Sequence, residues 1–442
     1  MVTLRASHIV KPIELIPNKV IPLSDFDQLM PLTHTRTIYF YRPTSNELLK
    51  NPIHILHDSL SKALVTFYPL AGRLHWTNGG RVELHCNSMG ALLLEAETEH
   101  KIDDFRDFCP TQILNLIPSA DYTTTPIQEV PLLLVQLTKL SCGGISLGLA
   151  ISHIVADGQS ALRFVSEWKK IARGIISNDH VFLDRTILQT NQQDYQTIPT
   201  LKYADFYPLP LLIGQSDTLL EREKETTAIM LKVSKEQVEK LKKRAANNQR
   251  TFSRFEVVSA HLWKCISMAR GIKPEQETVL YVHVDFRNRL KPPLPQNYFG
   301  NGVIAVPVNA IAGDIVSKSL GQISSKIREA MENVTDEYVR SYLVCMKNVQ
   351  DVSSSRSFYT VGSSKGLFFG NPNLTITSWI GLPLNGADFG WGDEFFMGPG
   401  SMGYDGKVFI ISSQSRDGSL VVSLRLQGEH MGAFEKYFYE EI

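Results

Sequence analysis

The segment SHIVADG, at residues 152–158, places His153 and Asp157 four positions apart and directly before Gly158. A neutral imidazole can accept a proton near physiological pH, because the unperturbed pKa of histidine is about 6.5. A hydroxyl or amine that is hydrogen-bonded to such an imidazole becomes able to attack a carbonyl carbon. Asp157 also has a structural interpretation, since aspartate is a favoured N-cap of a following helix. The spacing alone therefore leaves His153 open as a general base or as a satisfied core histidine.

The sequence contains no separate pattern that would supply a nucleophile of its own. It has no GxSxG elbow and no CxxC pair, and neither its GGI nor its GNG stretch precedes the GK[ST] of a phosphate-binding loop. The five cysteines are odd in number and far apart, which argues against a disulfide framework or a metal site. If His153 is catalytic, the attacking nucleophile therefore belongs to a substrate.

Composition narrows the classes of partner. The 442 residues include 45 basic and 45 acidic side chains, so the formal net charge is zero. This balance gives no electrostatic reason to expect nucleic acid or an anionic membrane. No apolar run reaches the ~18–20 residues that span a bilayer, and the opening MVTLRASHIVKP lacks the apolar region of a signal peptide. We expect a cytoplasmic globular protein of two or three domains.

The elements expected around SHIVADG put His153 at the end of a strand. Residues 131–140 and 145–152 form a predicted hairpin, and residues 159–174 have the apolar period of a helix. A further aromatic strand is expected at 37–43. A turn between a strand and a helix is a position from which a rigid scaffold presents a side chain.

The second half of the chain restarts after an irregular stretch. Residues 176–225 keep no lasting period, so we interpret them as a crossover that joins an N-terminal domain, 1–175, to a C-terminal domain, 226–442. Elements expected in the C-terminal domain include a strand at 226–233, a helix capped by Ser234 and Gln237, one helix over 314–331, and strands in KVFIISS and SLVVSLRLQ.

Several segments together carry a resemblance to a known family. HIVADG resembles the HxxxDG signature of the plant BAHD acyltransferases, which transfer an acyl group from acyl-coenzyme A to an alcohol or amine, and the second family signature, DFGWG, stands intact at 388–392. Further segments that look like family segments, in family order, are YPLAGRL (68–74), FLDRT (182–186), FRNRLKPPLPQNYFGN (286–301), LTITSW (374–379) and FFMGPG (395–400). The resemblance covers the whole chain.

The resemblance implies a fold similar to chloramphenicol acetyltransferase. This is an α/β fold with mixed (α+β) sheets, built from two related domains that are joined by a long crossover, with a channel at their interface. The co-substrate would be a hydroxycinnamoyl-coenzyme A, with no permanently bound cofactor and no metal. The family also implies a monomer that acts on small molecules in plant secondary metabolism.

The resemblance also assigns roles to individual residues. His153 would be the general base that deprotonates the acceptor as it attacks the thioester carbonyl. Thr377 and Trp379 match positions that hydrogen-bond the carbonyl oxygen in hydroxycinnamoyl transferases. Asp157 would face away from the channel and pair with Arg287. By family position, Asp388 and Trp391 are expected to be structural, and Ser253 and Arg254 are expected to contact coenzyme A.

The acceptor is expected to be chosen by residues in three segments. HTRTIYFY, at 34–41, looks like a pocket segment of hydroxycinnamoyl transferases and makes His34, Thr35, Thr37 and Tyr39 candidates. Gly381 stands where shikimate and quinate transferases carry an arginine, and Asp393 and Glu394 stand where those enzymes usually have Arg-Pro.

Relative to the shikimate and quinate transferases, this sequence lacks an arginine at position 381 and has two acids at 393 and 394. These differences favour a cationic acceptor such as the polyamine spermidine. SDFDQ, at 24–28, resembles a stretch of the spermidine hydroxycinnamoyl transferases and adds Asp25 and Asp27. The preferred hypothesis is therefore N-acylation that gives hydroxycinnamoyl amides (phenolamides). The alternatives are O-acylation of a neutral alcohol or of shikimate or quinate, and a catalytically silent protein that binds acyl thioesters.

Overall fold

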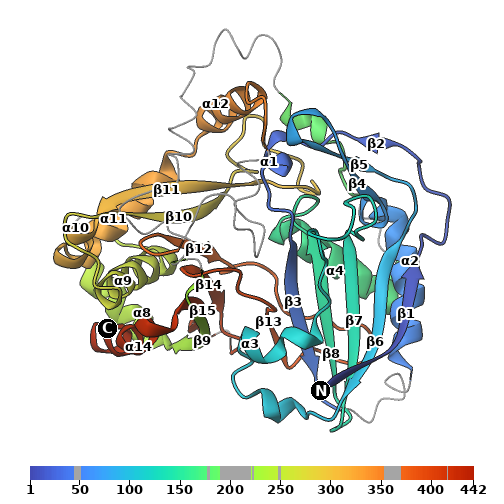
Figure 1. Ribbon diagram of the computed structural model, residues 1–442, viewed down its shortest axis with the longest axis horizontal. Coiled ribbons are helices and arrows are strands. Elements are labelled where there is room, and N and C mark those ends of the chain that lie inside the picture. The colour runs from blue at the N-terminus through green and yellow to red at the C-terminus, as the bar shows by residue number, and fades with distance from the viewer. Residues whose placement is uncertain are drawn as a thin grey trace.

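The computed structural model describes residues 1–43, 51–176, 180–189, 221, 223–246, 250–352, 370–415 and 417–442. Within these residues the strands form two six-stranded sheets and one three-stranded sheet (Figure 1). Most of the predicted crossover, residues 190–220, lies outside the described part of the chain.

The first six-stranded sheet carries the predicted hairpin. Its strands, in spatial order, are β1 (Val2–Val10), β6 (Ala91–Thr98), β7 (Leu133–Leu140), β8 (Ile145–Ser152), β3 (His34–Tyr41) and β13 (Phe396–Pro399). The β7 and β8 strands pair antiparallel, as predicted, and β8 pairs antiparallel with β3 so that Ser152 lies opposite His34. Helices α2 (Pro52–Thr66) and α4 (Gly158–Ala172) pack together on one side of this sheet (Figure 1).

The edge strand of this sheet comes from the C-terminal half of the chain. Phe396 pairs with Phe40 in an antiparallel ladder, and the Tyr41 hydroxyl donates to the carbonyl oxygen of Ala387 at 2.7 Å. Trp379 and the aromatic residues of DFGWG also pack into the apolar cluster of the first half. The predicted division at residue 226 therefore does not account for the chain between Trp379 and Pro399, which belongs to the first sheet and its core.

The second six-stranded sheet is built from the C-terminal half. Its strands, in spatial order, are β11 (Val303–Ile311), β10 (Glu277–Asp285), β12 (Leu374–Ser378), β14 (Lys407–Ser412), β15 (Leu420–Gln427) and β9 (Thr226–Val233). The β10, β12 and β14 strands run parallel to one another, and the other pairs are antiparallel. As in any sheet, successive side chains of each strand point to opposite faces.

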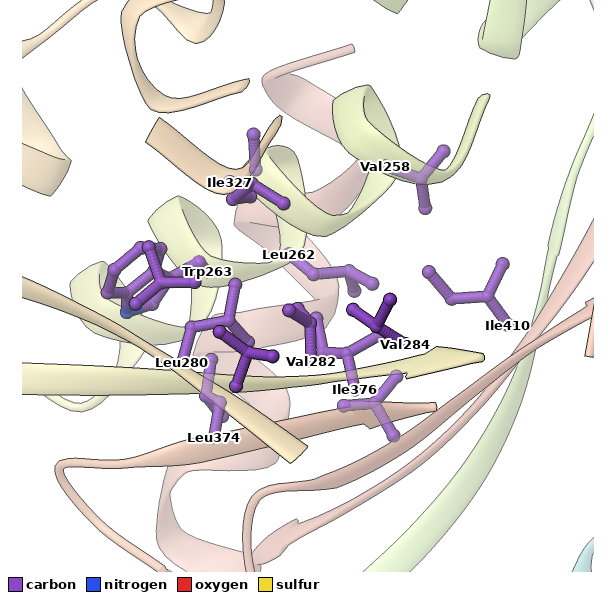
Figure 2. Packing of buried hydrophobic residues seen from close by; sticks show 14 of the residues in the cluster. Val258, Leu262, Trp263, Leu280, Val282, Val284, Ile327, Leu374, Ile376 and Ile410 are labelled. Atoms are coloured by element: carbon purple, nitrogen blue, oxygen red, sulfur yellow. The ribbon is translucent and has the colours of Figure 1, made fainter. Parts of the chain in front are cut away.

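Helices cover one face of the second sheet. They are α8 (Lys235–Ala245), α9 (Arg254–Ala269), α10 (Ala312–Ser317), α11 (Leu320–Glu332) and α14 (Gly428–Glu440). Figure 2 shows Leu262 of α9 packed close to Val282 of β10 and Ile376 of β12, and all three are fully buried. Burying these side chains leaves the alternate residues of the same strands on the opposite face, which is turned away from the helices.

One expected helix is divided in the structure. The periodicity predicted a single helix over 314–331, but α10 ends at Ser317 and α11 begins at Leu320. Ser319 caps α11, since its hydroxyl accepts from Gln322 N at 3.3 Å and Gln322 Oε1 accepts from Ser319 N at 3.0 Å. This capping box starts a new helix inside an apolar stripe that runs through both, so the prediction of one helix was wrong.

The remaining α-helices and strands of the described chain lie outside the two six-stranded sheets and the helices named above. They are α1 (Asp25–Gln28), α3 (Pro110–Ile113), α12 (Asp336–Lys347) and the three-stranded sheet of β2 (Val20–Ile21), β5 (Val82–His85) and β4 (Arg73–Trp76). None of the helices in these ranges has both the length and the apolar character of a membrane-crossing segment.

Candidate active site

His153 follows directly after the last residue of β8. Its backbone N–H donates to Thr33 O at 2.9 Å, which extends the pairing of β8 with β3 by one residue beyond the strand ends. The chain then turns, with Val155 N donating to Ser152 O at 3.0 Å, and α4 begins at Gly158. The predicted turn between a strand and a helix is therefore present.

Two buried side chains from distant segments hold the backbone of this turn. Asn301 Nδ2 donates to the carbonyl oxygens of His153 at 3.0 Å and Ile154 at 3.2 Å. Arg185 Nη2 donates to the carbonyl oxygen of Val155 at 2.7 Å. Three successive carbonyl groups are thus fixed, and a backbone so restrained presents the His153 ring in one position. Sequence reasoning assigned no role to Asn301 or Arg185.

Asp27 contacts both Arg185 and Asn301 and so holds these two side chains in place. Its Oδ1 lies 2.6 Å from Arg185 Nη1 and accepts from Asn301 Nδ2 at 2.8 Å, and the Asp27 side chain is fully buried. Asp25 is paired as well, at 2.6 Å from Arg81 Nη1. Both acids are engaged in structural ion pairs, so the expectation that they help to hold a cationic acceptor was wrong.

Asp157 anchors the other end of the turn. Its Oδ2 lies 2.8 Å from Arg287 Nη2 and accepts from Gly302 N at 2.9 Å, while its Oδ1 caps α4 by accepting from Ser160 N at 3.0 Å. Asp157 and Arg287 are almost completely buried. The predicted ion pair is present, and both carboxylate oxygens are fully occupied by structural donors.

Burial sets the protonation state of the His153 ring. It lowers the pKa of His153 below 6.5, because the charged imidazolium is penalised in a desolvated site. The negative charge of Asp157 opposes this effect, and the positive charge of Lys407 adds to it. His153 is therefore neutral at pH 7, which is the form that accepts a proton.

This shift predicts the acidic limb of the pH profile. The neutral form of His153 is present above the lowered pKa and is lost only as the pH falls through it, so we expect kcat/KM with an alcohol acceptor to stay level down to pH 6.5 and to fall below it. Initial rates between pH 5 and 8, at fixed ionic strength, measure this. An acidic limb centred above pH 6.5 would contradict the assignment of His153 as the base.

Thr377 lies in a polar cluster that sequence reasoning did not foresee. Its Oγ1 accepts from Lys407 Nζ at 2.8 Å and lies 3.2 Å from His283 Nδ1. Burial lowers the pKa of Lys407 to about 7, and burial together with the charge of Lys407 lowers that of His283 to about 3. The alternation of His283 between the apolar residues Val282 and Val284 is the signal that could have indicated a polar side chain on the open face of the sheet.

Trp379 forms one wall of an apolar pocket between the two halves. The other walls come from Thr35, Thr37 and Tyr39 of β3, from Ile151 of β8, from α4, and from Leu382, Leu384 and Met397. The structure therefore brings three of the predicted pocket residues together with Trp379. Ile151 of β8 is two residues before His153, so the strand that lines the pocket leads directly to the candidate base, although His153 itself is not among the lining residues.

Comparison with known proteins relates this site to a family. A family model described as "Transferase family" matches residues 1–441. The chain is 44% identical to a hydroxycinnamoyl-CoA:piscidic acid hydroxycinnamoyltransferase of Actaea racemosa over 100% of both chains. It is 39% identical to the shikimate O-hydroxycinnamoyltransferase of Nicotiana tabacum over 99% of each. The chain belongs to the BAHD acyltransferase family.

Further comparisons support the same assignment. A hydroxycinnamoyl-CoA:5-hydroxyanthranilate N-hydroxycinnamoyltransferase of Avena sativa is 38% identical over 99% of each chain. Vinorine synthase has the same fold, with a TM-score of 0.72 at 22% identity over 98% of this chain and 96% of that one. F. graminearum TRI101, complexed with coenzyme A and T-2 mycotoxin, matches with a TM-score of 0.75 at 17% identity over 95% and 97%. The predicted α/β fold with two domains is confirmed, and members of this family use an acyl-coenzyme A thioester as co-substrate.

His34 of this acyltransferase does not line the pocket. It is next to Thr35 on β3, so its side chain lies on the opposite face of the sheet. Its Nε2 lies 2.9 Å from Pro131 O and its Nδ1 3.3 Å from the Tyr122 hydroxyl, and burial lowers its pKa to about 4. The expectation of a pocket role was wrong, because strand alternation separates His34 from Thr35, Thr37 and Tyr39.

The residues expected to distinguish acceptors do not themselves line this pocket, although Leu382, next to Gly381, does. Gly381 is exposed at a turn with φ +82°, where an arginine would be strained, and it does not line the pocket. Glu394 accepts from the amides of Gly386 and Ala387 at 2.7–3.1 Å and so closes its own loop. Asp393 is exposed. Gly381, Asp393 and Glu394 are thus absent from the lining of this pocket.

DFGWG is architectural in this acyltransferase, in keeping with its family. Asp388 Oδ1 accepts from Gly390 N at 2.8 Å and Gly392 N at 2.9 Å, which folds the motif on itself. Trp391 is buried and packs edge-on against Tyr41, with ring centroids 5.7 Å apart. These contacts fasten the C-terminal segment to the first sheet.

The two candidate contacts to coenzyme A lie at the start of α9. Ser253 is the N-cap, with its hydroxyl accepting from Glu256 N at 3.3 Å, and Arg254 Nη1 donates to Gly418 O at 3.2 Å. A role for these residues in binding coenzyme A stays a prediction. In the described parts of the chain, no cluster of histidine, cysteine and acidic residues could hold a metal ion.

Proposed function

We propose that this acyltransferase moves a hydroxycinnamoyl group from coenzyme A to a hydroxyl or amino group of a small acceptor, with His153 as the general base. The observation that carries the proposal is a neutral imidazole on a rigidly held turn, beside an apolar pocket that contains Trp379. The relatives reported above transfer hydroxycinnamoyl groups, and they include both O- and N-transferases.

The proposed reaction balances its protons through His153 alone. The imidazole accepts the proton of the acceptor hydroxyl or amine as that atom attacks the thioester carbonyl carbon. The tetrahedral intermediate then collapses, the carbon–sulfur bond breaks, and the leaving thiolate of coenzyme A takes the proton back from the imidazolium. A single group thus acts first as base and then as acid.

Thr377 and Trp379 are the proposed neighbours of the carbonyl oxygen. Because Lys407 donates to Thr377 Oγ1, the hydroxyl hydrogen of Thr377 can point either to His283 Nδ1, at 3.2 Å, or to a substrate oxygen. A donor aimed at the developing oxyanion contributes about 2.7–4 kcal/mol to stabilising the transition state. The lining of the pocket, which includes Tyr39, Trp379 and the apolar side chains of α4, matches the apolar character of a hydroxycinnamoyl ring.

Spermidine was the acceptor preferred from the sequence, and the structure offers it little support. The acids invoked for a polyamine are engaged elsewhere or exposed: Asp25, Asp27, Asp393 and Glu394. The acceptors named for the relatives reported above are piscidic acid, shikimate and 5-hydroxyanthranilate. Spermidine therefore enters the test as one competitor among several acceptors.

An acceptor panel tests the proposed function. Purified protein is incubated with p-coumaroyl- or caffeoyl-coenzyme A and with spermidine, other amines, shikimate, quinate or simple alcohols. We expect stoichiometric release of coenzyme A and formation of an ester or amide, measured by thiol titration and mass spectrometry. Binding of the thioester without transfer to any acceptor would instead identify a silent thioester-binding protein. Size-exclusion chromatography and fractionation of the native tissue test the accompanying predictions of a monomer and of a cytoplasmic location.

A further inference from the structure

Lys407 occupies a central position on the open face of the second sheet. It begins β14, opposite Thr375 of β12, and it is half-buried. The next residue, Val408, is fully buried in the core under the helices, so strand alternation directs Lys407 to the other face. Phe409 of the same strand contacts Trp379, with ring centroids 4.9 Å apart. Lys407 therefore belongs to the surface that continues to the apolar pocket.

The ammonium group of Lys407 lies among the proposed catalytic residues. Its Nζ donates to Thr377 Oγ1 at 2.8 Å and lies 5.0 Å from the centre of the Phe409 ring. Its charge contributes to the low pKa values of both His153 and His283. A lysine this close to the predicted base and oxyanion donor is placed to meet a substrate.

Within the described part of the chain, Lys407 has no acidic partner. The acid nearest to it in sequence, Asp405, pairs with Arg270 at 2.9 Å. The other buried or half-buried acids around the turn are also engaged: Asp27 with Arg185, Asp157 with Arg287, and Glu394 with backbone amides. The exposed Asp285 pairs with Arg287 as well. His153 and His283 are neutral at pH 7. Protonated Lys407 therefore has no counter-ion among these groups, and burial without one lowers its pKa to about 7.

A partly desolvated cation without a counter-ion is costly to keep unless a ligand supplies the missing charge. The two groups that contact the ammonium group of Lys407, the Thr377 hydroxyl and the Phe409 ring, carry no negative charge. They therefore do not neutralise its positive charge. A polyamine would be repelled by this lysine. An anion would be attracted to it.

We propose that the acceptor carries a carboxylate, and that the ammonium group of Lys407 binds this carboxylate while the hydroxyl or amino group of the same molecule faces His153. The acceptor is then a hydroxy- or aminocarboxylic acid. This inference rests on the proposed function and deepens it, since it names the class of acceptor. Lys407 would be the residue that selects an acid over its uncharged analogue.

The test compares acids with their own methyl esters. Wild-type protein and Lys407→Met are assayed with p-coumaroyl-coenzyme A and with shikimate, 4-hydroxyphenyllactate or 5-hydroxyanthranilate, each beside its methyl ester. For each acid and methyl ester that the wild type acylates, we expect it to prefer the acid. Loss of one charged hydrogen bond should lower the ratio of kcat/KM for the acid to kcat/KM for its ester about 10–100-fold in Lys407→Met, mainly through a higher KM for the acid, whatever the variant does to the rate that acid and ester share.

Two controls separate a specific effect from a general one. Lys139→Met removes an exposed lysine that pairs with Glu95 at 2.8 Å on the first sheet, and it should leave both substrates unaffected. Lys407→Arg keeps the charge and should retain most of the preference for the acid. The thermal unfolding midpoint of each variant shows whether it is folded.

The outcomes also separate this inference from the proposed function. An equal loss of kcat/KM with acid and ester in Lys407→Met would show that the lysine acts on the oxyanion or on folding, and would overturn the inference. Wild-type transfer only to acceptors that lack a carboxylate would overturn it as well, while leaving the proposed function intact. The absence of wild-type transfer to acid, ester, alcohol or amine would instead defeat the proposed function.

Discussion

We expect His153→Ala to lower kcat by about 10²–10⁴-fold, the range that one positioned general base contributes. The backbone of His153 makes the hydrogen bonds that shape the turn, through its N–H to Thr33 and its carbonyl to Asn301, and alanine keeps both. The variant should therefore fold normally and still bind the thioester. Steady-state kinetics with the best acceptor of the panel, together with circular dichroism and the unfolding midpoint, measure the two effects.

A second buried histidine provides the matched control. His261 on α9 contacts Phe438 O through Nε2 at 2.8 Å, far in sequence from the proposed site. Its replacement by alanine should lower stability by about 1–3 kcal/mol, because it leaves a buried carbonyl without its donor, and should leave kcat nearly unchanged. If His153→Ala kept a near-normal kcat, or lost activity only in proportion to its stability, the assignment of His153 as the base would be wrong.

Arg287→Met should produce the largest loss of stability, about 3–5 kcal/mol, because it leaves the Asp157 carboxylate buried without its cation. Arg287 Nη2 lies 2.8 Å from Asp157 Oδ2, and their side chains are only 5% and 2% exposed. Activity should fall with stability, since Asp157 holds the end of the turn that carries His153. Urea unfolding monitored by tryptophan fluorescence, with kcat measured in parallel, tests both effects.

A surface pair of the same chemistry sets the baseline for this experiment. Arg173 Nη1 lies 3.6 Å from Asp388 Oδ2, and its side chain is 47% exposed. Arg173→Met should cost less than about 1 kcal/mol, because water already solvates this pair. Similar unfolding curves for the two variants would mean that the buried pair is not the anchor of the turn.

Several features of this protein were accessible from local sequence. The hairpin of 131–140 and 145–152, and the helix that follows it, have periods that depend on residues only a few positions apart. The position of His153 at the end of a strand followed from these elements. The partnership of Asp157 with Arg287, 130 residues away, came instead from the resemblance to a family, and the structure contains it.

Local sequence could not decide which charges are free to meet a substrate. The sequence shows only that Asp27 and Glu394 are acidic and that Lys407 is basic. In the structure Asp27 pairs with Arg185, Glu394 accepts from backbone amides, and Lys407 has no acidic partner among the described residues. Each of these outcomes depends on contacts between distant segments, which no local period specifies.

Contacts between distant segments and the alternation along a strand also explain why His34 and the chain from Trp379 to Pro399 lie elsewhere than predicted. His34 was placed beside Thr35 by sequence proximity, but alternation along β3 puts the two on opposite faces of the sheet. The chain from Trp379 to Pro399 was assigned to the C-terminal domain, but its aromatic residues pack into the core of the first. The sequence by itself, through its resemblance to a family, indicated the reaction class and made His153 the proposed base. Only the tertiary structure decided which charges surround that base, because neutralisation and burial are properties of contacts rather than of residues.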